Sequence, residues 1–319
     1  ANPGLPAVEI PMQHANVYAR ADALVPSADG YVLRETKAST FPLKSDRHTP
    51  ASPKPHHVND VAIQMWVMKE SGVRLTGAEL NLLDNTWRYP GQGNYTGLFR
   101  QLEVVEAAQR QQDDVGRWVQ ESQALLTRGM PDATTGKQCT QPYDCPFQTF
   151  CASLELTEEH PLELLPDNAG KKLAKRLREK GYKSILEPTS DELEGPQAPL
   201  YRRIQSAHRT GKGVLESGAA DVIAHLPFPR YFFDFEGIDF PVPQWPGFRP
   251  YEPAPFQWSC HIERSPGTFT HAEFLDLSGD DPSVSCIREM EQVIDPYDRG
   301  PIVVYNATYE KTRLAELAE

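Results

Sequence analysis

The sequence lacks long apolar runs, is poor in cysteine and has a deficit of positive charge. No window of 18 or more uncharged apolar residues occurs, which argues against a transmembrane helix and against a membrane as partner. Five cysteines in 319 residues do not make a disulfide framework, so we expect a reducing, cytoplasmic location. A formal net charge of −12 argues against a generally basic nucleic-acid coat protein but leaves an acidic, metal-binding nuclease open.

The positive charge that is present gathers in one segment. Residues 170–212 contain eleven Lys and Arg against five Asp and Glu, a local balance of +6. Such a run is either the solvated face of helices or a track for a nucleic-acid backbone. In the second interpretation, the residues that contact the backbone are Lys171, Lys172, Lys175 and Arg176.

Length and pattern predict an α/β protein of about two domains joined by basic helices. The expected elements are strands at 7–13, 16–25 and 31–37, a mobile loop at 42–57, a helix from 59 or 60 to 71, a strand at 78–84, a long helix over 98–128, basic helices at 168–186 and 198–215, strands at 230–237, 256–263 and 272–277, a helix at 283–294 and a buried strand at 301–306. We place the domains at 1–160, 161–228 and 229–319, the last incomplete. The chain opens without Met, so we expect a fragment of a longer protein.

The first candidate site lies on the second and third expected strands. Glu35 and Lys37 are two residues apart on one strand and share a face, and hairpin pairing can bring Asp22 beside them. Two carboxylates so placed suit Mg²⁺ or Mn²⁺, and the ammonium can orient a water or stabilise developing charge. A solvent-facing Glu/Lys pair on an edge strand is the alternative. Gln64, on the following helix, faces the same end.

The segments ARADAL, GYVLRETKAST and HHVNDVAIQMWVMKESG resemble the PD-(D/E)XK nuclease core of the RecB type. The resemblance implies a restriction-endonuclease-like mixed sheet flanked by helices. It also implies that Asp22 and Glu35 are metal ligands, Lys37 is the catalytic lysine, and Gln64 steadies the site or the DNA. The family's upstream His or Glu is absent here, and Met68 stands where a Tyr is often found.

Three cysteines form a Cys-x5-Cys-x5-Cys segment, Cys139, Cys145 and Cys151. Three thiolates need a fourth ligand for tetrahedral zinc or for a 4Fe-4S cluster, and three buried free cysteines are the alternative. The segment resembles RecB-like nucleases of the AddB type, which have one cysteine before the nuclease core and three after it. That resemblance implies iron–sulfur ligands, with the fourth cysteine preceding Ala1.

The second candidate site lies in RYFFDFEG, where Asp234 and Glu236 share one face of an apolar strand. If the pair is buried, it needs neutralisation, which divalent cations can supply; two exposed acids are the alternative. The segment resembles the Asp-x-Glu motif of DnaQ-type 3′–5′ exonucleases with an RNase H-like fold. VVYNATYEKTRL resembles their second motif, with Asn306 and Glu310, where the usual acid is Asp.

The two resemblances occur in the order seen in bacterial proteins that fuse an RNase H-like domain behind a RecB-like core. They imply a divalent-metal-dependent nuclease that acts on single- or double-stranded DNA in repair, recombination or defence. The alternative is a non-catalytic nucleic-acid-binding or scaffold protein built on two decayed nuclease folds. Metal binding distinguishes the two interpretations, because a decayed site should bind Mn²⁺ weakly.

Overall fold

The computed structural model describes residues 4–46, 48–155, 158–294, 297, 300–305 and 307–317. The chain divides into two compact units. The first comprises Ala1–Gly129 with Leu226–Glu319, and the second is Met130–His225. The first unit has two mixed sheets and the second is helical, which confirms the α/β class.

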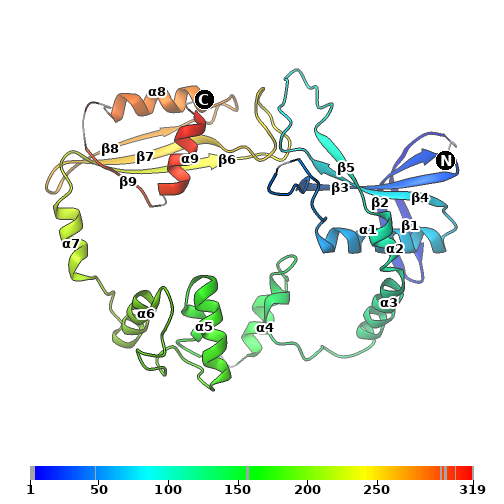
Figure 1. Ribbon diagram of the computed structural model, residues 1–319, viewed down its shortest axis with the longest axis horizontal. Helices are drawn as coiled ribbons and strands as arrows, with labels where there is room; N and C mark the ends of the chain where they lie inside the picture. The colour runs from blue at the N-terminus through cyan, green and yellow to red at the C-terminus, as the bar shows by residue number, and fades with distance from the viewer. Residues whose placement is uncertain are drawn as a thin grey trace. The chain divides into compact units, whose positions relative to one another are not determined.

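The first sheet has the order β1-β2-β3-β4-β5 (Figure 1). Its strands are β1 (Ala7–His14), β2 (Val17–Ser27), β3 (Gly30–Thr40), β4 (Leu75–Leu83) and β5 (Phe99–Glu103). All neighbours are antiparallel except β3 and β4, which are parallel and are joined by helix α1 (Pro55–Glu70). The helix begins at Pro55 rather than at residue 59 or 60, because proline at the first helical position has a suitable φ and needs no N–H partner.

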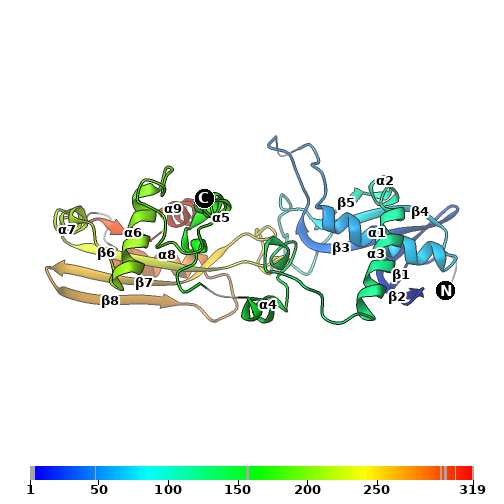
Figure 2. The same cartoon turned by 90° about the horizontal axis from the view of Figure 1, so that it is seen from below.

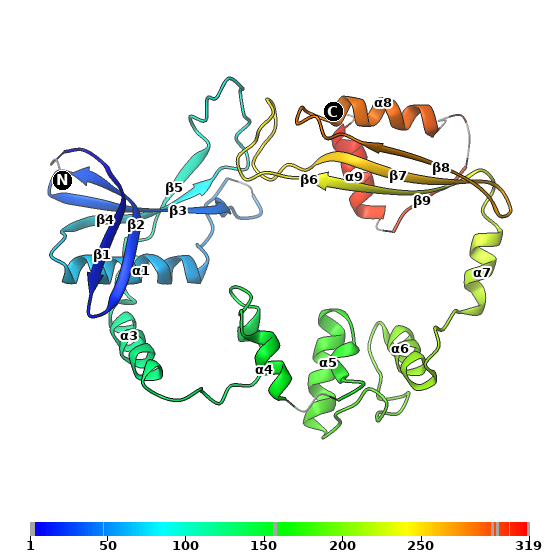
Figure 3. The same ribbon diagram turned by 180° about the vertical axis from the view of Figure 1, so that it is seen from behind.

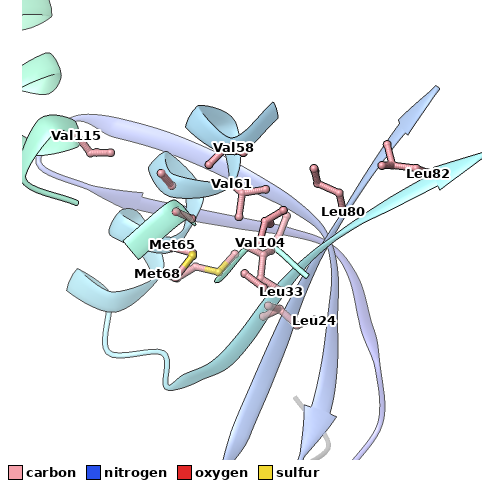
Figure 4. Close-up of a cluster of buried hydrophobic side chains, with 14 of the residues drawn as sticks. Leu24, Leu33, Val58, Val61, Met65, Met68, Leu80, Leu82, Val104 and Val115 are labelled. Atoms are coloured by element: carbon pink, nitrogen blue, oxygen red, sulfur yellow. The ribbon is translucent and has the colours of Figure 1, made fainter. Parts of the chain in front are cut away.

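Helix α1 packs on one face of this sheet and forms the first core (Figures 2 and 4). Leu24, Leu33, Leu80 and Leu82 come from the strands, and Val58, Val61, Met65 and Met68 come from the helix. Burial of such side chains contributes roughly 1.5–3 kcal/mol each, so the core fixes β3 against α1. The candidate site residues on these two elements are thereby held by the same packing.

The long helix expected over 98–128 was wrong in its first part. Leu98 and Leu102 have helical spacing, but Leu102 pairs with Leu80 across β4 and β5. Pairing with β4 therefore makes residues 99–103 a strand in spite of the helical spacing of the two leucines. Helices α2 (Val105–Gln109) and α3 (Gln112–Leu126) follow, and Val115 of α3 reaches the first core.

The second sheet has the order β8-β7-β6-β9, and its strands are β6 (Arg230–Ile238), β7 (Ala254–Ser265), β8 (Thr268–Leu275) and β9 (Ile302–Val303). Helices α8 (Ser283–Val293) and α9 (Ala307–Leu317) contribute to its core (Figure 3). Tyr231, Phe233, Phe235 and Trp258 form the apolar face. The last strand is shorter than expected and not fully buried, since Ile302 is half-exposed.

Two loops join the sheets of the first unit. The backbone of Tyr89 donates to Phe248 O at 2.9 Å and accepts from Gly247 N at 2.7 Å, as two paired strands would. The hydroxyl of Tyr251 donates to Ala38 O, one residue after Lys37, at 2.5 Å. The second sheet is therefore hydrogen-bonded to the strand that holds the first candidate site.

The second unit contains α4 (Gln148–Leu154), α5 (Asp167–Glu179), α6 (Ala198–Thr210) and α7 (Ser217–Ala224), with short 3-10 turns at Lys137–Cys139 and Leu162–Leu164. The two basic helices end earlier than expected. Gly181 and Gly211 have φ of 97° and 66°, a left-handed conformation that glycine adopts without strain and that ends a helix. Helix α7 was not predicted. In the described part of the chain no helix is long and apolar enough to cross a membrane.

A buried ion pair provides a test of the second sheet. Arg230 Nη1 lies 3.1 Å from Glu263 Oε2, and their side chains are 7% and 10% exposed. We expect Glu263→Gln to lower the opening free energy of β6 and β7 by about 3 kcal/mol, because it removes a charged partner of a buried guanidinium. Hydrogen-exchange mass spectrometry of peptides from these strands measures this. Glu121→Gln, which removes an exposed pair with Arg117, is the control and should leave the exchange unchanged.

Candidate active site

The first candidate site begins where the backbone pairing of β2 and β3 ends. Ala23 and Arg34 are the last paired positions at this end of the ladder. One step further, the side chain of Asp22 replaces the backbone as partner, and its Oδ2 accepts the Thr36 N–H at 2.7 Å. This hydrogen bond fixes Asp22 beside the segment that carries Glu35 and Lys37.

Lys37 connects the sheet to the helix. Its Nζ donates to Glu35 Oε1 on the same strand at 2.7 Å and also to Asp60 Oδ2 on α1. Glu35 is buried, Lys37 is about one-fifth exposed and Asp60 is 40% exposed. The three groups therefore run from the core of the unit to its surface.

Gln64 is a polar residue on the buried face of α1. Its Nε2 donates to Glu35 Oε2 at 2.8 Å and to Asp60 Oδ1 at 3.3 Å. Each oxygen of both carboxylates thus has a donor, one from Lys37 and one from Gln64. The structure brings together Glu35, Lys37 and Gln64 as the sequence predicted.

Asp60 is the site residue that the sequence analysis missed. Its position near the expected start of the helix made it a candidate cap, whereas it lies within the second turn of α1. The signal that could have found it is the spacing to Gln64, because residues i and i+4 share a helical face. An acid four residues before Gln64 therefore lies on the same face of the helix as Gln64.

The pKa values of both Glu35 and Lys37 are raised in this site. Desolvation raises the pKa of Glu35, and the hydrogen bonds from Lys37 and Gln64 only partly oppose it. For Lys37, burial alone would lower the pKa, but the hydrogen bonds to Asp60 and Glu35 and their charges outweigh it and raise the pKa. Lys37 therefore remains an ammonium at neutral pH, so it can donate protons in hydrogen bonds but cannot act as a base.

Burial also acts on a neighbouring histidine. His57, on the first turn of α1, is buried, and desolvation followed by the charges of His56, Lys54 and Lys37 lowers its pKa to about 4. The imidazole is therefore neutral at pH 7. It adds no positive charge that would repel a cation held by Glu35.

The residues present fit a divalent cation with few protein ligands. In the described residues no three His, Cys, Asp or Glu side chains converge into a metal site, so a closed structural site is not formed. Mg²⁺ instead commonly takes one or two carboxylates and completes its shell with water and substrate phosphate. Glu35 is a desolvated carboxylate, and the buried Gln64 Oε1 has no hydrogen-bond partner among the described residues. Asp22 and Glu35 would hold the cation.

The second candidate site is not assembled in the same way. Asp234 and Glu236 lie on β6 and share one face, but both are exposed. The expectation that burial makes this pair costly was wrong, because the alternating aromatic residues, not the acids, face the core. Their strand partners on β7 are Ser259 and Gln257.

Glu310 is buried on α9, and its Oε2 has no hydrogen-bond partner among the described residues. In that same part of the chain it does not join Asp234 and Glu236 in a group of three metal-ligating side chains. Asn306 lies outside the described residues. The structure thus brings Asp234 and Glu236 together and does not add Glu310 to them.

The cysteine segment is ordered by backbone contacts. Cys139 is buried, its Sγ accepts the Gly136 N–H at 3.4 Å, and its carbonyl accepts the Cys145 N–H at 2.7 Å. Cys145 and Cys151 are half-buried. The three thiols do not converge into a metal-ligating group among the described residues, so they do not fit a 4Fe-4S cluster by themselves. Cluster binding stays a prediction from sequence.

The basic residues of α5 are partly neutralised. Lys175 lies 3.9 Å from Glu179, and Arg176 Nη2 lies 3.0 Å from Glu194 Oε1. Lys171 and Lys172 are exposed, and no ion pair of theirs is recorded within the described ranges. The helix therefore presents less unpaired charge than its composition indicates.

Comparison with known proteins gives one match. Residues 231–319 match a family described as a domain of unknown function, DUF2779. The match begins in β6 and includes the second sheet, with Asp234, Glu236 and Glu310. A comparison with curated proteins finds no match.

The metal fit is tested by thermal unfolding. We expect Mn²⁺ at 100 times its dissociation constant to stabilise the first sheet by about 2.7 kcal/mol and so to raise Tm by several degrees. Asp22→Asn and Glu35→Gln should abolish this rise, because each removes a charged ligand. Asp29→Asn, in the exposed turn of the same hairpin, is the matched control and should retain it. An equal rise in all four proteins would show that the cation binds elsewhere.

The cysteine hypothesis is tested by metal content. Protein that includes the predicted upstream cysteine, purified without oxygen, should contain iron, and Cys145→Ser should reduce the iron to background. Cys260→Ser is the control, since Cys260 is buried in the core of the second sheet and belongs to the other compact unit. Stoichiometric zinc without iron would indicate a structural zinc site instead.

Proposed function

We propose that the first sheet holds a divalent-metal-dependent nuclease site that hydrolyses phosphodiester bonds of DNA, in repair, recombination or defence. The observation that supports this most directly is the Lys37 ammonium held between Glu35 and Asp60, with Asp22 fixed to the backbone between Glu35 and Lys37. The order of strand with Asp, turn, strand with Glu-x-Lys and helix with Gln is also that of the PD-(D/E)XK core.

In this proposal Asp22 and Glu35 would hold the metal. A bound divalent cation supplies Lewis acidity toward a phosphoryl oxygen and lowers the pKa of a bound water. Glu35 is held in one orientation by two donors, Lys37 and Gln64, and Asp22 by the Thr36 N–H. This fixed geometry avoids reorganisation when charge develops on the substrate.

Lys37 contacts the substrate in the same proposal. An ammonium has three N–H donors and no acceptor, and two acceptors for it are recorded among the described residues, Glu35 and Asp60. The third N–H is available to a phosphoryl oxygen. Because the raised pKa keeps Lys37 charged, it stabilises the negative charge that grows on phosphorus-bound oxygens.

Asp60 and Gln64 position the reacting groups. Gln64 donates to both carboxylates, so it bridges them as Lys37 does and holds the helix carboxylate beside the strand carboxylate. Asp60 gives Lys37 a second partner, on the helix, and so helps to hold the ammonium in place beside Glu35. Neither residue needs to touch the substrate for this role.

One observation favours a non-catalytic role for the second sheet. Asp234 and Glu236 are exposed, and among the described residues no lysine or amide donates to them as Lys37 and Gln64 donate to Glu35. We therefore assign catalysis to the first sheet and a nucleic-acid-binding or scaffold role to the second. The exonuclease assignment of Asp234, Glu236 and Glu310 remains a prediction from sequence.

Cleavage of labelled DNA with Mg²⁺ or Mn²⁺ tests the proposal. We expect Lys37→Ala and Asp22→Ala to abolish cleavage, and Asp60→Asn to lower kcat by one to two orders of magnitude with little change in KM, because it acts through Lys37. Asp234→Ala should retain activity if the first sheet is the catalytic one.

Lys69→Ala is the matched control, since Lys69 is exposed at the other end of α1. Unchanged cleavage by both Lys37→Ala and Asp22→Ala would remove the nuclease site from the first sheet. Loss of cleavage in Asp234→Ala alone would transfer catalysis to the second sheet.

A further inference from the structure

The loop between β3 and α1 is the most basic segment next to the candidate site. Residues 41–54, which join β3 to α1, contain three Lys and Arg, one His and a single acid, in a chain of net charge −12. The loop leaves β3 three residues after Lys37 and leads into the helix that carries Asp60 and Gln64. The loop therefore directly joins the two elements that carry the carboxylates of the site.

The topology brings a second loop to the same edge. Strands β3 and β4 are parallel, so their carboxyl ends lie together, and the loops that follow each strand leave from there (Figure 1). Ligands of parallel α/β sheets are commonly bound outside the carboxyl ends of the strands. The loop after β4 contains Thr86 and leads to Arg100 at the start of β5.

Arg100 is pre-positioned at this edge. Its guanidinium lies 4.1 Å from the ring centre of Phe41, and Phe41 is buried and bonded through its N–H to Leu83 O at 2.7 Å. A stacked guanidinium is held flat and keeps its donors free for an oxyanion. No hydrogen bond from this guanidinium is recorded among the described residues, and its nearest acid, Asp84, is 3.9 Å away.

Arg100 faces an open cavity of about 420 Å³ that is also lined by Asp46, His48 and Thr86. The carboxylate in this cavity, Asp46, already accepts hydrogen bonds from its own loop. Asp46 accepts the His48 and Thr49 N–H groups at 2.9 and 2.8 Å and the Thr49 hydroxyl at 2.6 Å. The Asp46 carboxylate holds His48 and Thr49 in place through these hydrogen bonds. The three donors partly neutralise its negative charge, so it repels a bound anion less.

Asp84 also accepts hydrogen bonds from its own loop. One of its oxygens accepts the N–H and the hydroxyl of Thr86 at 2.9 and 2.6 Å. Lys54 Nζ reaches Ser39 Oγ at 3.4 Å and so lies over the end of β3. Arg100 and Lys54 are thus cations with unused donors at the strand ends, and Lys44 adds a third from the loop.

We propose that Lys44, Lys54 and Arg100 bind the phosphate backbone of a nucleic acid at the carboxyl ends of β3 and β4. The phosphates they hold are next to the one that enters between Asp22, Glu35 and Lys37. The proposal rests on the nuclease function proposed above for that site. The cations lie on two separate segments of the edge, which suits a chain of phosphates rather than a single small anion.

Binding without metal tests the proposal independently of cleavage. The probe is a fluorescent 20-nucleotide single strand of mixed sequence in EDTA, with RNA of the same sequence and duplex DNA as parallel arms, each followed by anisotropy across a salt series. We expect Lys44→Gln/Lys54→Gln/Arg100→Gln to weaken binding of at least one strand more than tenfold. The slope of log K against log salt should become shallower by about 2, or roughly 0.7 for each lost contact.

The matched control is Lys69→Gln/Arg74→Gln/Arg110→Gln, which removes the same charge from exposed positions elsewhere on the first sheet's domain. It should keep the parent slope. Equal affinity and slope for the two triple variants would overturn the proposal. Weakened binding by the loop variant in a protein that never cleaves would retain the binding edge and reject the nuclease, so the two failures are distinguishable.

Discussion

The structure of the first sheet depends on one ammonium that is largely, though not fully, withdrawn from solvent. Lys37 projects from the face of β3 that α1 covers, a position where an unpaired charge would be costly. Glu35 alone would leave its charge only half-satisfied, and Asp60 supplies the second partner from the helix. Gln64 then completes both carboxylates. Each of these four polar side chains has its hydrogen-bond partners among the other three. These hydrogen bonds fix which turn of α1 lies against which residues of β3.

Most of this set follows from the sequence, and the part that does not has a physical reason. Strand periodicity places Glu35 and Lys37 on one face, and a hairpin brings Asp22 near them. Asp60 was missed because the first turn of α1 was placed at the wrong residue, and a helix start is set by local geometry such as the proline at Pro55. In the same way, β5 was mistaken for helix, because Leu102 is held by Leu80 of a strand some twenty residues earlier.

The second sheet shows the opposite outcome from a similar pattern. Asp234 and Glu236 also alternate along a strand, but no helix of the described residues brings a lysine or amide to them, and both side chains are exposed. An alternating pair of acids predicts only that they share a face. Whether that face is buried depends on what covers the sheet, which is determined by segments distant in sequence. The match of residues 231–319 to a domain of unknown function gives no chemistry to this face.

The end of β3 shows how the rest of the unit serves the site. Just beyond Lys37, three contacts hold the strand: Tyr251 donates to Ala38 O, Lys54 to Ser39 Oγ, and Phe41 N to Leu83 O. They come from the loop between β6 and β7, the basic loop and the neighbouring strand. These contacts fix the end of β3, which helps to keep the Lys37 ammonium between its two carboxylates. Phe41 also stacks under Arg100, and the core that fixes β3 therefore also fixes the cation at its edge.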